Sequence, residues 1–380
     1  MKHIEQIFTN AKLVLPDEVV DGTIVIRGGV IADVQPGHAQ NGQDMEGDFL
    51  IPGLVELHTD HLENHYHPRP GVDWPAISAV MAHDAQIAGA GITTVYDALR
   101  AGTFDPGDLA ARDGEKLIIA INEAQAAGHL RAEHFIHLRC EMPCPDTIDS
   151  AERTTAAGRV GLISIMDHTP GARQFTSLDK FRQYYLGKKL ILPEKIEAYI
   201  EERIGYQKQF AAANKAAILA LADELGIAKL SHDDATVAHV DEALADGVNI
   251  AEFPTTAESA KAAHGHGLKV LMGAPNFVRG GSHSGNISTL DVARAGHLDI
   301  MSSDYVPVSL LMAAFALPEA TEAMSLAQAL RLVTLNPAEA AGLIDRGQIA
   351  AGKRADLVRV RRVEGQPVVR QVWRAGHRVL

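Results

Sequence analysis

The sequence predicts an α/β protein, a (β/α)8 TIM-like barrel with a small β-sandwich domain built from both chain termini. In the middle of the chain, eight short apolar runs alternate with helical patterns, and near-continuous apolar strands separated by helices are typical of a closed parallel sheet. Both ends are instead rich in short strands and turns, such as "IRGGVIADV" and "RAGH", which are hairpin signals. We therefore expect the sandwich over 1–50 and 350–380, and the barrel over 51–349.

The eight predicted barrel strands are "GLVELHTD", "ITTVYDAL", "EHFIHLRCEM", "VGLISIMDH", "IAKLSHDD", "VNIAEFPTT", "LKVLMGAP" and "LDIMSSDY". Residues 175–225 exceed an ordinary connection, so we interpret them as an insertion and a helix that form a lid over the site. No glycine-rich nucleotide-binding fingerprint follows an early strand.

Composition limits the partners and the compartment. The formal net charge of -13 argues against binding to nucleic acid or to an anionic membrane through bulk charge. An anionic substrate would therefore need a local basic pocket. The two cysteines, the lack of a signal-peptide pattern and the lack of a long apolar run predict a cytoplasmic protein outside the membrane. A homodimer is the default oligomer.

Ligand-type side chains gather at the ends of the predicted strands. A lone histidine at a strand end is more often structural, but here five of the eight strand ends carry such residues. Burying several carboxylates together is costly unless cations compensate them. We therefore predict two divalent metal ions, with Zn²⁺ favoured and Mn²⁺ or Fe²⁺ as alternatives, and with Glu141 as the bridging ligand. The predicted ligands are His58, Asp60, Glu141, His168, His232 and Asp304.

Longer motifs resemble a known family. The approach "PGLVELHTD", the last strand with Asp304 and the closing "GQIAAGKRADLV" resemble the amidohydrolase superfamily over essentially the whole chain. "HTDHLENHYHPRPGVDWP", "HLRCEM", "SHDDAT", "AEFPTT" and "GAPNFVRGGSHSGN" are similar to the PhnM-type family of the carbon–phosphorus lyase pathway. This resemblance implies a diphosphatase that hydrolyses α-D-ribose 1-methylphosphonate 5-triphosphate to the 5-phosphate and pyrophosphate. Many superfamily members carry a histidine where Glu252 stands here, so either His168 or Glu252 completes the metal site.

Such a substrate is highly anionic, and three segments offer positive charge. The glycine-rich loop after the seventh strand suits phosphate binding, prolines stiffen the backbone around an arginine in "HPRPGVDW", and the lid carries scattered basic residues. The predicted substrate-binding residues are Arg69, Lys180, Arg182, Arg279, Gly280, Gly281, Ser282, His283 and Ser284.

We predict that a water activated between the two cations attacks the α-phosphorus, with Asp304 as proton acceptor and His65 or His67 as proton donor to the leaving pyrophosphate. Two alternatives stay open. One is another amidohydrolase reaction, namely hydrolysis of a cyclic amide or deamination. The other is a non-catalytic metal-binding subunit of a phosphonate-processing assembly.

Overall fold

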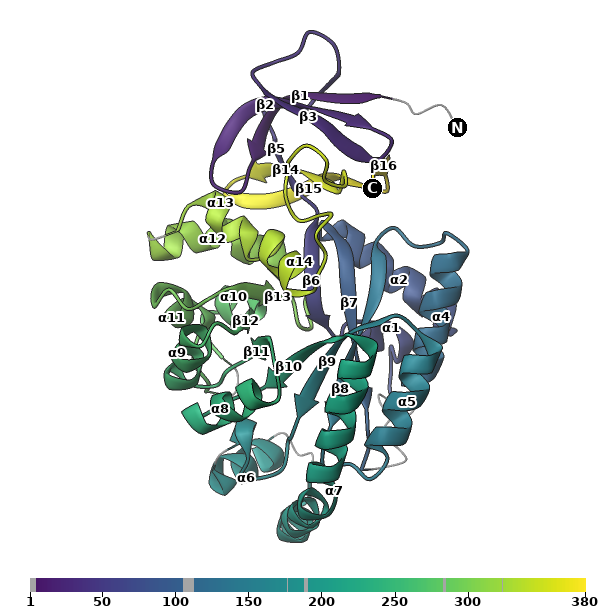
Figure 1. Ribbon diagram of the computed structural model, residues 1–380, viewed down its shortest axis with the longest axis vertical. Helices are drawn as coiled ribbons and strands as arrows, with labels where there is room; N and C mark the ends of the chain where they lie inside the picture. The colour runs from purple at the N-terminus through teal and green to yellow at the C-terminus, as the bar shows by residue number, and fades with distance from the viewer. Residues whose placement is uncertain (1–4, 105–112, 176, 188–190, 283–284, 323) are drawn as a thin grey trace.

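The structure, a computed structural model, describes residues 5–104, 113–175, 177–187, 191–282, 285–322 and 324–380. Its centre is a sheet of eight parallel strands in the order β13-β12-β11-β10-β9-β8-β7-β6, and the predicted fold class is confirmed (Figure 1). The strands are β6 (Leu54–Thr59), β7 (Ile92–Ala101), β8 (Glu133–Glu141), β9 (Val160–Met166), β10 (Ala228–His232), β11 (Ile250–Glu252), β12 (Lys269–Gly273) and β13 (Ile300–Ser302).

The first and last strands of this sheet meet and bring the ring together. Thr59 and Asp304 form a parallel bridge, and the Asp304 N–H donates to the His58 carbonyl at 3.0 Å. Glu56 fastens the same seam, because its carboxyl group accepts from the backbone N–H groups of His58 and Ser303, each at 2.7 Å. Burial raises the pKa of Glu56 to about 8. The seam therefore fixes the backbone that carries His58 and Asp304.

Apolar side chains fill the barrel interior, and helices cover its outside. The interior cluster takes aliphatic residues from several strands: Val55, Leu57, Leu162, Leu230, Ile250, Leu271 and Ile300. The surrounding helices are α1 (Leu62–Tyr66), α2 (Ala76–Gly89), α4 (Gly114–Ala126), α5 (Thr147–Ala157), α8 (Val237–Ala245), α9 (Ala257–Gly265), α10 (Ala274–Val278), α11 (Thr289–Arg294), α12 (Ser309–Thr321), α13 (Leu326–Arg331) and α14 (Leu335–Ala340).

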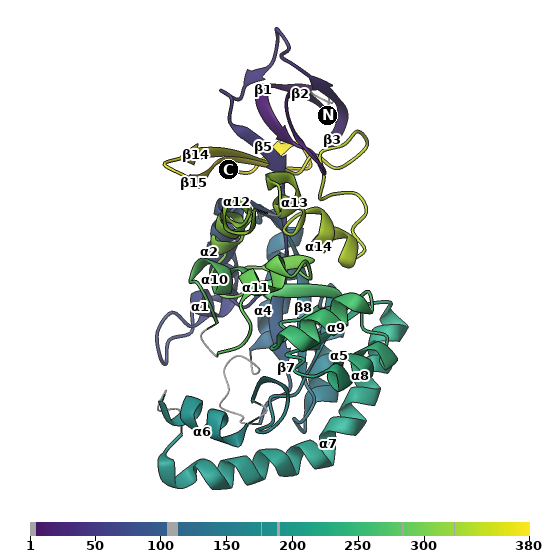
Figure 2. The ribbon, with the colours of Figure 1, turned by 90° about the vertical axis from the view of Figure 1, so that its left-hand side faces the viewer.

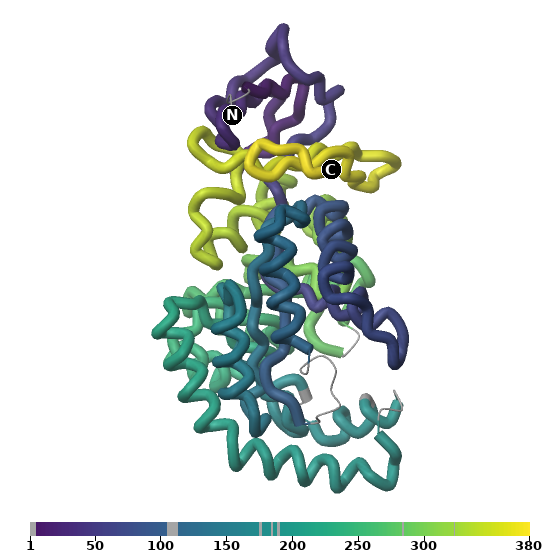
Figure 3. The backbone as a smooth tube through the Cα atoms, turned by 90° about the vertical axis from the view of Figure 1, so that its right-hand side faces the viewer, coloured from purple at the N-terminus to yellow at the C-terminus, as the bar shows by residue number. Residues whose placement is uncertain are grey.

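Both chain ends build a second sheet, which lies above the barrel in Figure 1. In it, the C-terminal strands lie beside the N-terminal ones (Figure 3), in the order β16-β15-β14-β5-β1-β2-β3, with β4 paired to β1. Its strands are β1 (Gln6–Val14), β2 (Val19–Arg27), β3 (Val30–Pro36), β4 (Gln43–Asp44), β5 (Phe49–Pro52), β14 (Leu357–Val363), β15 (Gln366–Arg374) and β16 (His377–Arg378). Phe8 packs on Trp373 with ring centroids 4.6 Å apart, so the two termini share one core.

The long connection after β9 is helical. A short 3-10 turn, η1 (Arg173–Phe175), precedes α6 (Leu178–Gly187), and a second, η2 (Pro193–Lys195), precedes the 30-residue helix α7 (Ile196–Leu225). Figure 2 shows α7 running far past the barrel, with α6 lying alongside its outer part. Within the described residues, no helix combines the length and apolar character that crossing a membrane requires.

A partly buried ion-pair group ties the C-terminal segment to the barrel. Glu133, at the start of β8, accepts from Arg346 at 2.7 Å and also pairs with Arg354. Burial alone would raise the pKa of Glu133, but the two guanidinium groups outweigh it and lower the pKa to about 2. The ionised carboxylate thus stabilises the folded state above its ordinary pKa, and this contribution is lost as the pH falls toward 2.

We expect Glu133→Gln to lower the free energy of unfolding by roughly 2 kcal/mol near neutral pH, because two arginines lose their shared counter-charge. The difference from wild type should shrink below about pH 4, where wild-type Glu133 becomes protonated on unfolding. Urea unfolding at several pH values measures both effects. Glu115→Gln removes only an exposed pair with Arg153 and should change stability by less than about 0.5 kcal/mol. Equal effects of the two substitutions would contradict this account.

Candidate metal centre

A cavity of about 600 Å³ opens at the carboxyl ends of the barrel strands. Five of the six predicted ligands line it: His58, Asp60, His168, His232 and Asp304. They come from the ends of β6 and β10 and from the residues just after β6, β9 and β13. Since parallel strands present their carboxyl ends at one face, residues far apart in the chain gather around one space.

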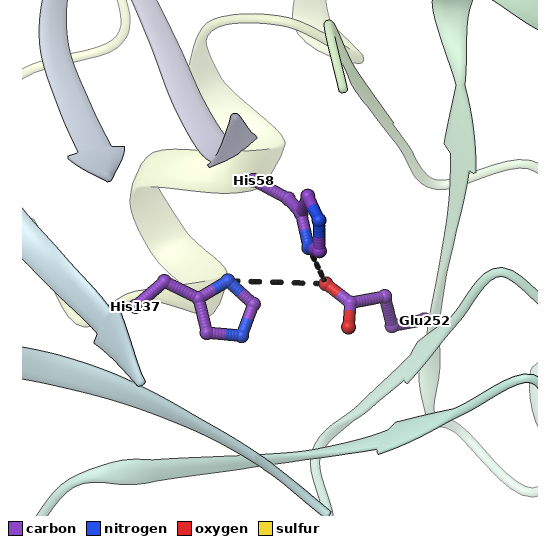
Figure 4. A group of neighbouring side chains, drawn as sticks. All are labelled: His58, His137 and Glu252. Atoms are coloured by element: carbon purple, nitrogen blue, oxygen red, sulfur yellow. Dashed lines mark hydrogen bonds and ion pairs between the residues drawn. The ribbon is translucent and has the colours of Figure 1, made fainter. Parts of the chain in front are cut away.

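Glu252, on β11, is hydrogen-bonded to two of these imidazoles, and Figure 4 shows its carboxyl group beside His58. Its Oε1 lies 2.7 Å from His58 Nδ1, and its Oε2 lies 2.6 Å from His232 Nδ1. Burial alone would raise the pKa of Glu252, but the imidazoles of His58 and His137 hold it well below its usual range. An ionised carboxylate can only accept hydrogen bonds, so each Nδ1 donates. Each Nε2 therefore keeps its lone pair for the cavity.

Glu141 supports His168 in the same way. Its Oε2 is hydrogen-bonded to His168 Nδ1, and its Oε1 accepts from the His168 backbone N–H at 2.9 Å. Burial alone would raise the pKa of Glu141, but its close contacts with His168 lower it to about 2. Both oxygens of Glu141 are thus engaged by His168, and its role as the bridging metal ligand stays a prediction.

Asp233 is a ligand-type residue that the sequence reasoning passed over. Its Oδ2 is buried and has no hydrogen-bond partner among the described residues. It lies 3.5 Å from His232 Nε2 and 3.9 Å from His168 Nε2. The "SHDDAT" motif was a visible signal, but strand alternation would turn Asp233 away from His232. A left-handed backbone at Asp233, with φ 55°, ends the strand there and breaks that alternation.

His168, His232 and Asp233 therefore form a group fit to hold a metal ion. One ligand atom from each of them lies within 4.8 Å of the others. Two imidazoles with free lone pairs and one unpartnered carboxylate oxygen leave further positions open toward the cavity. Such an open three-residue set is typical of catalytic metal sites.

The other side of the cavity carries His58, Asp60 and Asp304. Burial raises the pKa of Asp304, His58 opposes this effect and the nearby charge of Asp60 adds to it, so that the pKa is about 6. Two half-buried acids on adjoining strand ends are favourable places for a cation. Glu252 thus stands between two ligand groups and orients one imidazole of each.

Among the predicted substrate-binding residues, Arg279 and Ser282 line the cavity. Arg279 also donates to the Tyr305 hydroxyl at 3.3 Å. Gly280 and Gly281 follow Arg279 with φ values of 80° and 153°, a backbone that favours glycine. His283 and Ser284 lie outside the described residues. Sequence reasoning missed Arg139, which lines the cavity from β8.

The remaining predicted residues lie away from the lining of this cavity. His65 Nε2 is 2.9 Å from Gln86 Oε1, and His67 Nδ1 is 3.0 Å from Asp73. Arg69 is exposed in a turn closed by the Val72 N–H. On α6, Lys180 is exposed and Arg182 pairs with Glu197 at 2.7 Å. The catalytic and substrate-binding roles given to these residues stay predictions.

A second buried cluster lies between the barrel and α2. His83 Nε2 and His134 Nδ1 each lie 2.7 Å from a different oxygen of Asp97. Burial alone would raise the pKa of Asp97, but these two imidazoles lower it below its usual range. Hydrogen bonds from the two histidines are therefore enough to explain why the buried Asp97 is ionised.

We expect Asp233→Asn to weaken metal binding by at least about 10-fold, because it removes the unpartnered carboxylate charge. Glu252→Gln should weaken it comparably, since two imidazoles lose the acceptor that fixes their tautomer. Metal content after dialysis against graded chelator measures both, with the exposed Asp17→Asn as control. Wild-type metal retention by Asp233→Asn would exclude this residue as a ligand.

Comparisons with known proteins agree with this architecture. The model of the Amidohydrolase family matches residues 208–380. The chain is 47% identical over 376 residues to the alpha-D-ribose 1-methylphosphonate 5-triphosphate diphosphatase of Escherichia coli (strain K12), covering 98% of this chain and 100% of that relative.

Two solved structures show the same fold at low identity. The N-acetyl-D-glucosamine-6-phosphate deacetylase of Mycobacterium smegmatis has a TM-score of 0.64 at 18% identity, covering 99% of this chain and 100% of that one. The 5-methylcytosine deaminase of Klebsiella pneumoniae has a TM-score of 0.66 at 16% identity, covering 99% and 98%. On the strength of the near-full-length relative, this chain belongs to the family of α-D-ribose 1-methylphosphonate 5-triphosphate diphosphatases within the amidohydrolase superfamily.

Proposed function

We propose that this protein hydrolyses α-D-ribose 1-methylphosphonate 5-triphosphate to the 5-phosphate and pyrophosphate, as a step in phosphonate catabolism. The observation that carries this proposal is the 47% identity, over 98% of the chain, to a relative that bears this activity in its name. The cavity supports it, because metal-ligand groups and arginines share one space. Cleavage of a phosphate anhydride uses both metal ions and arginines, because negative charge develops on the phosphoryl oxygens during the reaction.

We also propose that the site takes two divalent cations. The unpartnered Oδ2 of Asp233 and the free Nε2 atoms of His168 and His232 fit one of them, and His58, Asp60 and Asp304 would hold the other. This mixed imidazole and carboxylate set suits Zn²⁺, with Mn²⁺ or Fe²⁺ as alternatives. When bound, such cations lower the pKa of a water and offset negative charge on phosphoryl oxygens.

The protein's own groups position the reactants and move the proton. In the hydrolysis, the oxygen of a water forms a bond to the α-phosphorus, and the bond from that phosphorus to the bridging oxygen breaks. The bridging oxygen leaves on pyrophosphate with the electron pair. Asp304 accepts the proton of the attacking water, because its carboxylate lines the cavity and burial makes it a better base than an exposed aspartate.

The proposals for the cellular compartment and the oligomeric state of the protein rest on its composition. We propose a cytoplasmic enzyme, and the free, buried thiols of Cys140 and Cys144 suit a reducing compartment. The homodimer stays a prediction.

We expect the metal-loaded protein to release one pyrophosphate for each ribose triphosphate consumed. Asp304→Asn should lower kcat by about 10²–10⁴-fold, because the proton acceptor is lost. Coupled detection of pyrophosphate, with metal content measured on the same sample, separates loss of the base from loss of metal. Full activity in Asp304→Asn with metal retained would remove Asp304 from the mechanism. Lack of release by metal-loaded wild type would overturn the proposed function.

A further inference from the structure

Three alternate residues of β8 point to the cavity side of the strand: His137, Arg139 and Glu141. Two of them are fully engaged by the protein. His137 hydrogen-bonds to the Leu57 carbonyl at 2.8 Å and to Ser164, and Glu141 binds His168 with both oxygens. Arg139 differs from its neighbours in this respect.

The guanidinium of Arg139 is incompletely satisfied by the part of the chain that the structure describes. Its Nε is buried without a hydrogen-bond partner among the described residues. The charged group paired with it is Asp60, whose Oδ2 lies 3.8 Å from Nη1, beyond hydrogen-bond distance. Leaving a buried N–H unsatisfied costs about 1–3 kcal/mol. The Arg139 side chain is 17% exposed, lines the cavity and projects from a strand. It can therefore bind an acceptor that enters the cavity.

The chemistry of this acceptor follows from the shape and charge of the group. A guanidinium presents its N–H donors as a planar fork that matches two oxygens of one phosphate. Arg139 Nη1 lies 3.8 Å from Asp60 Oδ2, and both residues line the cavity together with Asp304. The oxygens it binds therefore lie beside the residues proposed to hold a cation and to accept the proton.

Arg279 occupies the opposite side of the barrel mouth. It follows α10, which comes directly after β12. In the ring of eight strands, β12 and β8 lie four positions apart in either direction. Arg279 is exposed at the rim, whereas Arg139 is largely buried. A chain of phosphates can therefore contact Arg139 with one phosphate and extend toward Arg279 with the others.

We propose that Arg139 binds the oxygens of the α-phosphate, which is the one attacked, and that Arg279 binds the departing pyrophosphate. This assignment rests on the proposed function and gives the triphosphate a direction in the cavity. The α-phosphate lies deep beside Asp60, Asp304 and Arg139, and the β- and γ-phosphates point to the rim. Arg139 contributes to the rate because it offsets charge on the reacting phosphate, while Arg279 contributes mainly to binding.

The two products test the two positions separately. Ribose 5-phosphate carries a phosphate like the one left after cleavage, and pyrophosphate is the leaving group. Calorimetric titration of each into metal-loaded wild type, Arg139→Gln and Arg279→Gln gives affinities that do not depend on turnover. Arg153→Gln, which alters an exposed pair on α5, is the matched control, and metal content is measured for every sample.

We expect Arg139→Gln to weaken ribose 5-phosphate binding by at least about 10-fold while pyrophosphate binding changes by less than about 2-fold, and to lower kcat by about 10²–10³-fold. Arg279→Gln should show the reverse, with weaker pyrophosphate binding, a raised KM and a smaller effect on kcat. Arg139→Lys keeps the charge without the fork and should fall between Arg139→Gln and wild type. It also tests the position if Arg139→Gln fails to fold.

Several results would overturn this assignment. If the Arg139 variants lose metal while both products bind the remaining holoenzyme as in wild type, Arg139 serves only as the counter-charge of Asp60. If Arg139→Gln loses pyrophosphate instead of ribose 5-phosphate, the direction of the substrate is reversed. A different result would overturn the proposed function. In that case metal-loaded wild type would not cleave the triphosphate, although the Arg139 and Arg279 variants change the product affinities as expected.

Discussion

The candidate site depends on one buried carboxylate. Glu252 lies under the cavity with its two oxygens on His58 and His232, and its contacts with the neighbouring imidazoles hold its pKa well below the usual range despite complete burial. Because an ionised carboxylate only accepts, it fixes the tautomer of both rings and directs both free nitrogens into the cavity. Glu141 imposes the same constraint on His168. The ligand geometry is thus set by acids behind the imidazoles, before any cation or substrate enters.

Backbone conformation at the strand ends completes this arrangement. Asp233, Phe253 and Asp304 have φ values of 55°, 54° and 52°, in the left-handed region that costs non-glycine residues about 1 kcal/mol or more. Each lies within two residues of the end of its strand. Such turns release side chains from strict alternation, so two acids join the cavity and the Phe253 ring packs against His58 and His232. Three of the nine described non-glycine residues with positive φ thus lie at strand ends that line the cavity.

An acidic protein can bind an anionic substrate when the binding cavity itself carries positive groups. The formal net charge is -13, yet the cavity combines metal-ligand groups with Arg139 and Arg279. In a recessed site of low polarisability, a few fixed positive groups act more strongly than the distant, solvent-screened acids of the surface. The superfamily barrel is shared with a deacetylase and a deaminase, so the selection of a phosphate chain lies in such local groups and not in the fold.

The sequence alone determined the strand–helix alternation, the joining of both termini in one sheet and most of the candidate ligands that line the cavity, because apolar periodicity and strand ends are local features that parallel topology brings to one face. It also named Glu252 as the alternative to His168 in the metal site, and the "SHDDAT" motif as part of the family resemblance. Only the tertiary structure decided that Glu141 and Glu252 stand behind imidazoles, that Asp233 turns into the cavity and that His65 and His67 lie away from its lining. Those outcomes depend on backbone φ at single residues and on hydrogen bonds between strands far apart in the chain. Neither feature leaves a periodic pattern in the sequence. Arg139 was likewise found only in the structure, from its place in the cavity lining and its unsatisfied Nε.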